Sequence, residues 1–378
     1  MGRATVGRTT PSRHPLQRIP DRMSLTPPGS GVPAENVRRP VIDPRLTTIQ
    51  PGGGWVMSLE LAWGSVRRWL LRKFRPAYVE RMRGLRQGER GTLPFDPVDP
   101  RDLKYYRNQD THWWPDADDP FRWRDSLPFV RAGLAELVLI GGFFIVLGGL
   151  LSWYWWPLGL PAFVVAGLVV WFFRDPPRAI PTDHGVVVAP ADGKVVQIDE
   201  IDDPDIGPAI QFGIFLSIFN VHINRCSLAG KVVEIRYRPG KFLNALRPES
   251  ARENEHLDVL LVTPDRSAKA FRIRQITGQF ARRIVCWVRP GDVLAKGEPF
   301  GMIKLGSRTE LVIPRDPSLQ IEVAIGETIR AGSSRMARYR LEVVAENPKG
   351  FEAGGTAVGA SPADLNSDAG TQGRDELR

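Results

Sequence analysis

The sequence has few of the residues that build disulfide frameworks and metal sites. Its 378 residues include two cysteines, Cys226 and Cys286, and five histidines. Two cysteines cannot form a multi-bridge secreted scaffold, and they cannot supply a four-cysteine zinc site by themselves. We therefore expect a chain from a reducing compartment that holds no metal.

Extreme composition is also absent. Hydrophobic residues make up 42% of the chain and charged residues 25%, which excludes wholesale disorder and a collagen-like chain. The formal net charge of +9 could indicate nucleic acid, an anionic membrane or an arginine-rich tail. Residues 1–131 carry 23 Lys and Arg against 14 Asp and Glu, whereas residues 132–378 carry 28 of each. Since the excess precedes an apolar segment, we expect anionic membrane lipids, and not nucleic acid, as its partner.

Charge is missing altogether from one long segment, between Leu137 and Phe173. One bilayer crossing needs about 20 residues, so this run is too long for one span and just long enough for two short ones. Aromatic residues and a proline in residues 152–157 favour a turn at the interface. We predict a transmembrane helical hairpin over residues 131–178. A buried helical pair in a soluble core is the alternative.

The charges around this run predict its orientation. Arginines precede and follow the apolar segment, and the short connection between the two halves has none. By the positive-inside rule both ends lie in the cytoplasm. We therefore expect an inner (plasma) membrane protein whose following domain lies on the cytoplasmic face.

The segments that flank the hairpin and the following domain differ from them in composition and apolar periodicity. Residues 1–57 and 348–378 lack apolar periodicity and are predicted to be disordered. Residues 58–130 contain a basic amphipathic pattern, broken by Pro76, that suits an anionic membrane surface. A solvated helix with scattered charges is the alternative for that segment.

Residues 179–347 contain short β-branched segments separated by Gly, Pro or Asp turns, which predicts a mainly β domain. Two phrases in it echo one another, Val288-Arg-Pro-Gly-Asp-Val-Leu-Ala-Lys-Gly-Glu and Val323-Ala-Ile-Gly-Glu-Thr-Ile-Arg-Ala-Gly. Such turns are typical of compact barrel-sandwich domains, whose hairpins need residues that accept positive φ. The predicted fold class is therefore a mainly β, barrel-sandwich-like catalytic domain, preceded by the helical hairpin and the basic extension.

Three residues at strand ends of this domain could carry chemistry. Asp192 lies in a tight turn, His222 follows an apolar strand, and Ser307 lies between two apolar strands. Each has a structural explanation by itself: a turn cap, a structural histidine and a plain turn. Together they have the residue types of a nucleophile, its base and the group that orients the base.

The chain resembles the phosphatidylserine decarboxylase family, in its shorter bacterial class. The resemblance covers about residues 130 to 345, in the family's order and approximate spacing. Five motifs carry it: Phe172-Phe-Arg-Asp-Pro-Pro-Arg178, Ala189-Pro-Ala-Asp-Gly-Lys194, Phe219-Asn-Val-His-Ile-Asn-Arg225, Asn254-Glu-His256 and Phe300-Gly-Met-Ile-Lys-Leu-Gly-Ser-Arg308.

The resemblance implies a self-cleaving enzyme that converts phosphatidylserine to phosphatidylethanolamine and CO2. Ser307 would attack the carbonyl of Gly306, cleave the chain there and become a covalent pyruvoyl group, which serves as the electron sink. His222 would be the acid/base group, and Asp192 would orient it. The two cleaved chains would stay associated, and a homo-oligomer would be compatible with this class.

Two positions differ from the larger class of the family. Arg308 follows Ser307 where that class has threonine, and Phe219 occupies the position of a first histidine. Both are expected of the shorter class, and they leave a related serine phospholipid such as archaetidylserine open as the substrate. His256, where the family usually has Arg or Lys, receives no catalytic role.

Two rival functions remain open from the residues alone. A membrane-tethered barrel-sandwich module without catalytic activity would explain the hairpin and the repeated turns, but not the combination of Ser307, His222 and Asp192. A hydrolase with an Asp-His-Ser triad is the second rival. No Gly-x-Ser-x-Gly elbow surrounds Ser307, which disfavours that reading.

Overall fold

The computed structural model of the chain describes most of the sequence after residue 53. The described residues are 54–88, 93, 95–103, 112–245, 247, 249–265, 268–279, 283–304 and 307–340. The predicted disordered tail and nearly all of the predicted disordered extension lie outside them, as does Gly306 of the predicted cleavage site.

The basic segment before the hairpin contains two helices, α1 (Gly54–Phe74) and α2 (Pro76–Leu85), which meet at the proline that interrupts the sequence pattern. Part of its positive charge is neutralised internally. Arg67 pairs with Asp99 at 2.8 Å and with Asp102 of the short 3-10 helix η1 (Pro100–Leu103). Some arginines of helix α1 therefore form ion pairs within the fold. Trp63, Trp69 and Phe74 are among the exposed side chains of this helix.

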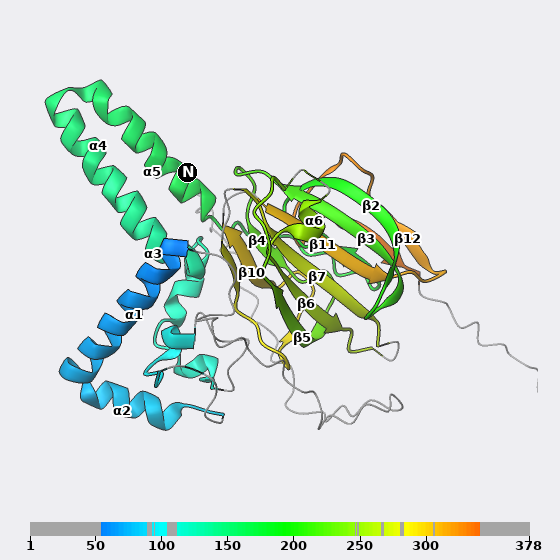
Figure 1. Cartoon of the computed structure of the whole chain (residues 1–378), viewed down its shortest axis with the longest axis horizontal. Coiled ribbons are helices and arrows are strands. Elements are labelled where there is room, and N and C mark those ends of the chain that lie inside the picture. The colour runs from blue at the N-terminus through cyan, green and yellow to red at the C-terminus, as the bar shows by residue number, and fades with distance from the viewer. Residues whose placement is uncertain are drawn as a thin grey trace, which may run out of the picture. The chain divides into compact units, whose positions relative to one another are not determined.

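The apolar run forms two helices joined by a turn (Figure 1). The first is continuous from Arg131 to Tyr154 and is built from η4 (Arg131–Gly133), α3 (Leu134–Glu136), η5 (Leu137–Gly141) and α4 (Gly142–Tyr154). The second comprises η6 (Trp156–Gly159) and α5 (Leu160–Phe172). The turn thus falls at Trp155, within the aromatic and proline cluster that predicted it.

Among the described residues, only the first of these two helices is both long enough and apolar enough to cross a membrane. Its 24 residues are long and apolar enough to cross a membrane, and 11% of its most apolar window is buried within the chain, unlike a core helix. The second apolar helix, Trp156–Phe172, is shorter. The expectation of two spans therefore reduces to one helix of spanning length and a shorter partner.

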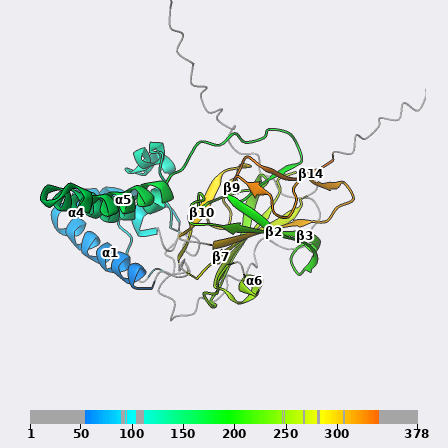
Figure 2. The same ribbon diagram turned by 90° about the horizontal axis from the view of Figure 1, so that it is seen from above.

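Helices α4 and α5 lie side by side (Figure 1 and Figure 2). Glycines allow the two helices to approach each other closely. A Cβ atom at Gly148 would lie 2.8 Å from the ring of Phe163, and one at Gly159 would lie 2.3 Å from the carbonyl oxygen of Gly148. Small residues at such points let helix backbones approach without a hydrophobic driving force between them.

The part after the hairpin is mainly β, as predicted. An eight-stranded antiparallel sheet, order β13-β2-β3-β11-β7-β6-β5-β9, curls beside two three-stranded sheets, β1-β14-β12 and β4-β10-β8 (Figure 1). The strands are β1 (Val186–Val188), β2 (Gly193–Asp203), β3 (Gly207–Leu216), β4 (Ile223–Arg225), β5 (Gly230–Arg238), β6 (His256–Val262), β7 (Ala270–Thr277), β8 (Arg283–Cys286), β9 (Val293–Leu294), β10 (Pro299–Lys304), β11 (Ser307–Pro314), β12 (Leu319–Ile321), β13 (Thr328–Ile329) and β14 (Arg335–Tyr339), with one short helix, α6 (Ser250–Glu253).

The two echoing phrases occupy equivalent places in this sheet. Each contributes a two-residue strand, β9 or β13, at one of the two edges of the eight-stranded sheet. The predicted positive φ values are confirmed at both: +98° at Gly291 and +79° at Gly297, +93° at Gly326 and +73° at Gly332. Between the edges the alternate residues of β3, β7 and β11 form one apolar core.

The ends of the hairpin are anchored to the β domain. Val130 donates its backbone N–H to the carbonyl of Phe173 at 2.9 Å. Phe173 and its neighbour Phe172 pack in one buried cluster with Ile223 of β4 and Met302 of β10. Lys304 of β10 forms an ion pair with Glu136 at the start of the apolar helix. Both ends of the hairpin therefore pack against the small sheet that carries the histidine motif.

We expect Gly133→Ala to loosen this anchor. A Cβ at Gly133 would lie 1.9 Å from Cδ1 of Phe173, so the ring must move out of its cluster. Overpacking of this kind costs about 1–3 kcal/mol of stability. Thermal unfolding of the detergent-solubilised protein should show a lower midpoint. Gly142→Ala is the matched control, since a Cβ there meets no atom within 4 Å; equal midpoints for both variants would contradict the anchor.

Candidate active site

The segment after α5 joins the hairpin to two of the motif loops. Arg178 donates from Nη2 to Oδ2 of Asp192 at 3.0 Å, and both side chains are nearly buried. Asp175 accepts at 2.7 Å from Nη2 of Arg225, at the end of the histidine motif. The motif that follows the hairpin thus contacts both the aspartate motif and the histidine motif.

Ser307 is the first residue of β11, in the interior of the large sheet. It pairs with Leu216 of β3 on one side and with Thr277 of β7 on the other. The residue is fully buried, and its Oγ makes no hydrogen bond within the described part of the chain. A buried hydroxyl without a partner costs about 1–3 kcal/mol of stability.

Strand pairing limits the distance between His222 and Ser307. The backbone N–H of Ile303 in β10 donates to the carbonyl of His222 at 3.2 Å, and Ile303 precedes Ser307 by four residues. Four residues span at most about 14 Å, so this linkage limits how far apart the two can lie. On the other side, Leu216 pairs with Ser307 and precedes His222 by six residues. Two short connections therefore converge on the predicted nucleophile and base.

His222 is buried against the end of the helical hairpin. Its ring lies 4.6 Å from the ring of Phe172, centroid to centroid, and its residue exposure is zero. Burial lowers the pKa of His222 to about 4, and the nearby Arg174 cation contributes in the same direction, against the effect of the hydrogen bond to Asn220. The imidazole is therefore neutral at physiological pH.

The hydrogen bond of His222 selects its tautomer. Nδ1 lies 2.9 Å from the carbonyl oxygen of Asn220, which can only accept, so Nδ1 carries the proton. In a neutral imidazole the other nitrogen, Nε2, then holds the lone pair. His222 thus has the protonation state of a general base.

Asp192 lies in the turn between β1 and β2. A Cβ at Gly193 would lie 2.2 Å from the carbonyl oxygen of Phe215, so glycine lets this turn approach the end of β3 closely. The Asp192 carboxylate accepts from Arg178 and, at 2.7 Å, from the backbone N–H of Ala331. Since Asn220 accepts from the Nδ1 of His222, the orienting role of Asp192 stays a prediction.

A buried polar network that the sequence did not single out accompanies Ser307. Asn224 donates from Nδ2 to Oγ1 of Thr309 at 2.9 Å, and Gln275 donates from Nε2 to Oδ1 of Asn224 at 2.8 Å. Thr309 shares the face of β11 with Ser307, because side chains two apart point the same way. Asn224 lies inside the histidine motif and could have been suspected. Gln275 carries no such signal, since only sheet pairing brings it here.

Charged residues occupy the opposite face of the same strand. Arg308 donates from Nε to Oε1 of Glu310 at 3.0 Å and also contacts Gln197 of β2. Burial raises the pKa of Glu310, against the lowering effects of Arg308 and Arg274. His256, to which no catalytic role was assigned, is buried with Nδ1 2.8 Å from the carbonyl oxygen of Asn254.

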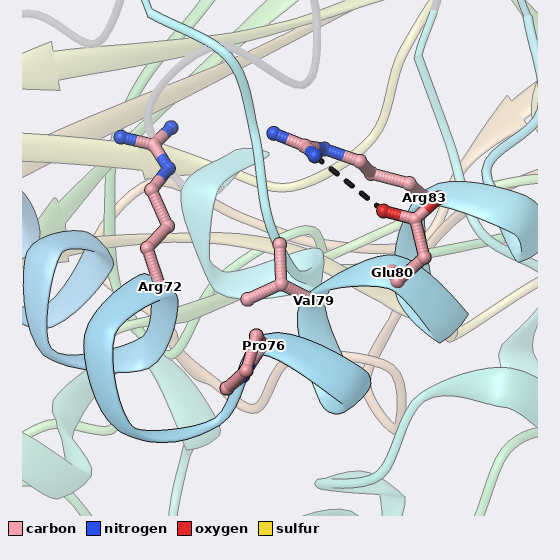
Figure 3. A pocket seen from close by; sticks show the side chains of 5 residues that line it. All are labelled: Arg72, Pro76, Val79, Glu80 and Arg83. Carbon is pink, nitrogen blue, oxygen red and sulfur yellow. Dashed lines mark ion pairs between the residues drawn. The ribbon is translucent and has the colours of Figure 1, made fainter.

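A pocket of about 260 Å³ lies elsewhere, at the junction of α1 and α2 (Figure 3). Its lining includes Arg72 and Arg83, and Arg83 pairs with Glu80 at 3.6 Å and with Asp96 at 2.8 Å. The pocket contains none of the three predicted site residues. In the part of the chain that the structure describes, no group of three or more His, Cys, Asp or Glu is arranged to hold a metal ion.

Comparison with known proteins identifies the family. The family model described as phosphatidylserine decarboxylase matches residues 165–337. A phosphatidylserine decarboxylase proenzyme of Rhodopirellula baltica is 63% identical over 238 residues, which are 63% of this chain and 99% of that protein. Proenzymes of the same name from Nitrosomonas eutropha and Syntrophus aciditrophicus are each 39% identical, over 57% and 58% of this chain and 94% and 99% of theirs. With this agreement across nearly the full length of its relatives, the chain belongs to the phosphatidylserine decarboxylase family.

Proposed function

We propose that this protein is a self-processing phosphatidylserine decarboxylase that releases CO2 from phosphatidylserine and yields phosphatidylethanolamine, a step of phospholipid biosynthesis. Its relatives are named as proenzymes of this activity. The observation that carries the assignment to a site is the buried Ser307 hydroxyl, unpartnered in the described chain, in the neighbourhood of a neutral histidine.

The first step is cleavage of the chain between Gly306 and Ser307. Nε2 of His222 takes the Oγ proton of Ser307, and Oγ attacks the carbonyl carbon of Gly306. The peptide C–N bond breaks, its nitrogen takes up a proton, and an ester replaces the amide. Loss of the Cα proton of Ser307 then breaks the Cβ–O bond and releases the Gly306 carboxylate. Water replaces the nitrogen as ammonia, and a pyruvoyl group caps Arg308.

The residues around Ser307 fit such a group. The position is fully buried, and the face of β11 that it shares with Thr309 is polar through Asn224 and Gln275. When formed, a pyruvoyl group supplies a carbonyl that binds the substrate amine and withdraws electrons as CO2 leaves. His222 is the residue that exchanges a proton there, and the cover of Phe172 keeps water from its ring.

The small chain produced by cleavage stays in the fold. Strand β11 pairs along its length with β3 and over most of it with β7, so the cut falls before an interior strand with partners on both sides. Strands β12 and β14 share a sheet with β1 of the large chain. These ladders support a tight complex of the two cleaved chains, and the curled sheet with its two small neighbours serves as a barrel-sandwich-like domain.

The enzyme acts at the inner (plasma) membrane, with the β domain on the cytoplasmic face. The apolar helix Arg131–Tyr154 supports the attachment, and arginines at both ends of the hairpin support the orientation. The basic segment that contains α1 and α2 binds anionic lipids through the arginines that remain outside its internal ion pairs. The hairpin over residues 131–178, the basic segment over 58–130 and the β domain over 179–347 are thus separate parts of one membrane enzyme.

Mass spectrometry of the purified protein tests the cleavage. Under denaturing conditions we expect two chains, one ending at Gly306 and one beginning with a pyruvoyl group in place of Ser307, which elute together under native conditions. Ser307→Ala should remain one chain and should not decarboxylate phosphatidylserine, whereas Ser318→Ala, in the same small chain, should be processed. An intact wild-type chain would overturn the proposal.

The lowered pKa of His222 predicts the pH dependence of self-cleavage. Because the base must be neutral, the rate of cleavage should stay constant as the pH falls from neutral and should decline only near the pKa of about 4. Phe172→Ala exposes the ring and should move the midpoint up towards the ordinary histidine value. The measurement is a cleavage time course of freshly synthesised precursor, with circular dichroism as the check on folding. A wild-type midpoint near the ordinary value would contradict the proposed base.

Asp192→Asn and Arg178→Gln form a matched pair that tests the role of Asp192. Each breaks the buried ion pair between the two side chains and should cost stability by a similar amount, about 3–5 kcal/mol. If Asp192 orients His222, Asp192→Asn should in addition slow cleavage by roughly tenfold or more beyond Arg178→Gln. Equal cleavage rates in the two variants would reduce Asp192 to a structural role.

A further inference from the structure

The loop between β3 and β4 exposes two large apolar side chains. Ile218 is 50% exposed and Phe219 is 60% exposed, although Leu216 at the end of β3 and all of β4 are buried. The loop is a defined turn, because Ser217 donates its backbone N–H to Oδ1 of Asn220 at 2.8 Å, and Asn220 donates its own to the carbonyl of Ser217 at 3.0 Å. The exposed pair is therefore presented on a fixed backbone.

This loop is attached to the end of the apolar helix α5. Nε1 of Trp171 donates to the carbonyl oxygen of Phe219 at 3.2 Å, and Nη2 of Arg174 donates to the same oxygen at 3.1 Å. The guanidinium of Arg174 stacks over the ring of Trp171 at 3.9 Å. Leu168 and Trp171 are themselves about half exposed. The apolar surface of the helix thus continues into Ile218 and Phe219.

The chemistry of this junction matches a membrane interface. Tryptophan and arginine are the residues that lie at the boundary between acyl chains and headgroups. Here an exposed tryptophan and a partly exposed arginine hold the loop at the end of an apolar helix. A bilayer that surrounds α5 therefore also meets the loop.

The same loop leads directly into the reaction centre. It begins after Leu216, the strand partner of Ser307, and it ends at His222. The carbonyl of Phe219 is bound to the helix end, and the next carbonyl, that of Asn220, accepts from the ring of His222. One turn of backbone thus connects the exposed apolar pair to the proposed base.

We propose that Ile218 and Phe219 insert into the bilayer interface beside α5 and form the edge over which the phosphatidylserine headgroup reaches Ser307 and His222. The inference rests on the proposed function and names how that site takes its lipid substrate. The occupant of this surface is the phospholipid bilayer. Arg174, at the same edge, supplies a positive charge at the depth of the headgroups.

Kinetics with two forms of the substrate test the proposal. The double variant Ile218→Asp with Phe219→Asp should still cleave itself, which shows that it folds. On vesicles that contain phosphatidylserine its apparent KM should rise roughly tenfold, as expected for two half-exposed apolar side chains that lose their burial. On short-chain, monomeric phosphatidylserine its activity should equal that of the wild type. Val293→Asp is the control, since Val293 is 69% exposed in β9, at an edge of the sheet order four strands from β11.

The outcomes separate this proposal from the function on which it rests. Wild-type protein that decarboxylates neither substrate would overturn the proposed function. Wild-type activity on vesicles in the double variant would overturn the insertion alone. An equal loss on vesicles and on monomeric lipid would also overturn it, because the loop would then act on the reaction centre and not on the bilayer.

A fluorescent label gives a direct second measurement. Both native cysteines are fully buried, so a cysteine introduced by Phe219→Cys can be labelled selectively with an environment-sensitive dye. Addition of vesicles should shift its emission to the blue, and the same dye at Val293→Cys should not respond. No shift at position 219 would overturn the proposal. A shift that appears without vesicles and depends on protein concentration would also overturn it, because it would indicate a second copy of the chain as the occupant.

Discussion

Two ion pairs, one nearly buried and one partly exposed, connect the hairpin to the β domain. Arg178 with Asp192 and Asp175 with Arg225 connect one short segment, directly after the hairpin, to the turn before β2 and to the end of β4, which lie in different sheets. Ion pairs of this kind add little net stability over apolar substitutes, but the loss of one partner leaves an uncompensated buried charge. The backbone N–H of Arg225 also donates to the carbonyl oxygen of Pro190 at 2.8 Å, so the aspartate and histidine motifs contact each other directly as well.

The helical hairpin contributes a side chain to the candidate site. Phe172, the last residue of α5, packs on the ring of His222, and burial of this histidine is the main cause of its lowered pKa. A neutral imidazole with its proton on Nδ1 is what a serine nucleophile needs from its base. The end of the apolar helix thus contributes to the surroundings of a buried, neutral histidine that lies outside the helix.

The proposed cleavage before Ser307 is compatible with preservation of the fold. A break before an edge strand would leave that strand with one partner, but β11 lies between β3 and β7 and its alternate residues contribute to the main core. The strand that begins at the proposed cut is therefore held by two ladders and by its apolar side chains. The buried hydroxyl at its first residue is a local cost that this surrounding structure can support.

The sequence by itself determined the elements whose signals are local. The uncharged run predicted the helices and the position of their turn, the repeated glycine phrases predicted positive φ, and short β-branched segments predicted a mainly β domain. The motifs indicated the family, and Ser307, His222 and Asp192 as its site. Only the tertiary structure decided that one apolar helix has full spanning length, that Asn220 accepts from His222, and that Gln275 belongs to the network beside Ser307. It also decided that Ile218 and Phe219 continue the surface of α5. These depend on contacts between residues far apart in the chain, and no local periodicity records which strand ends or helix ends will meet.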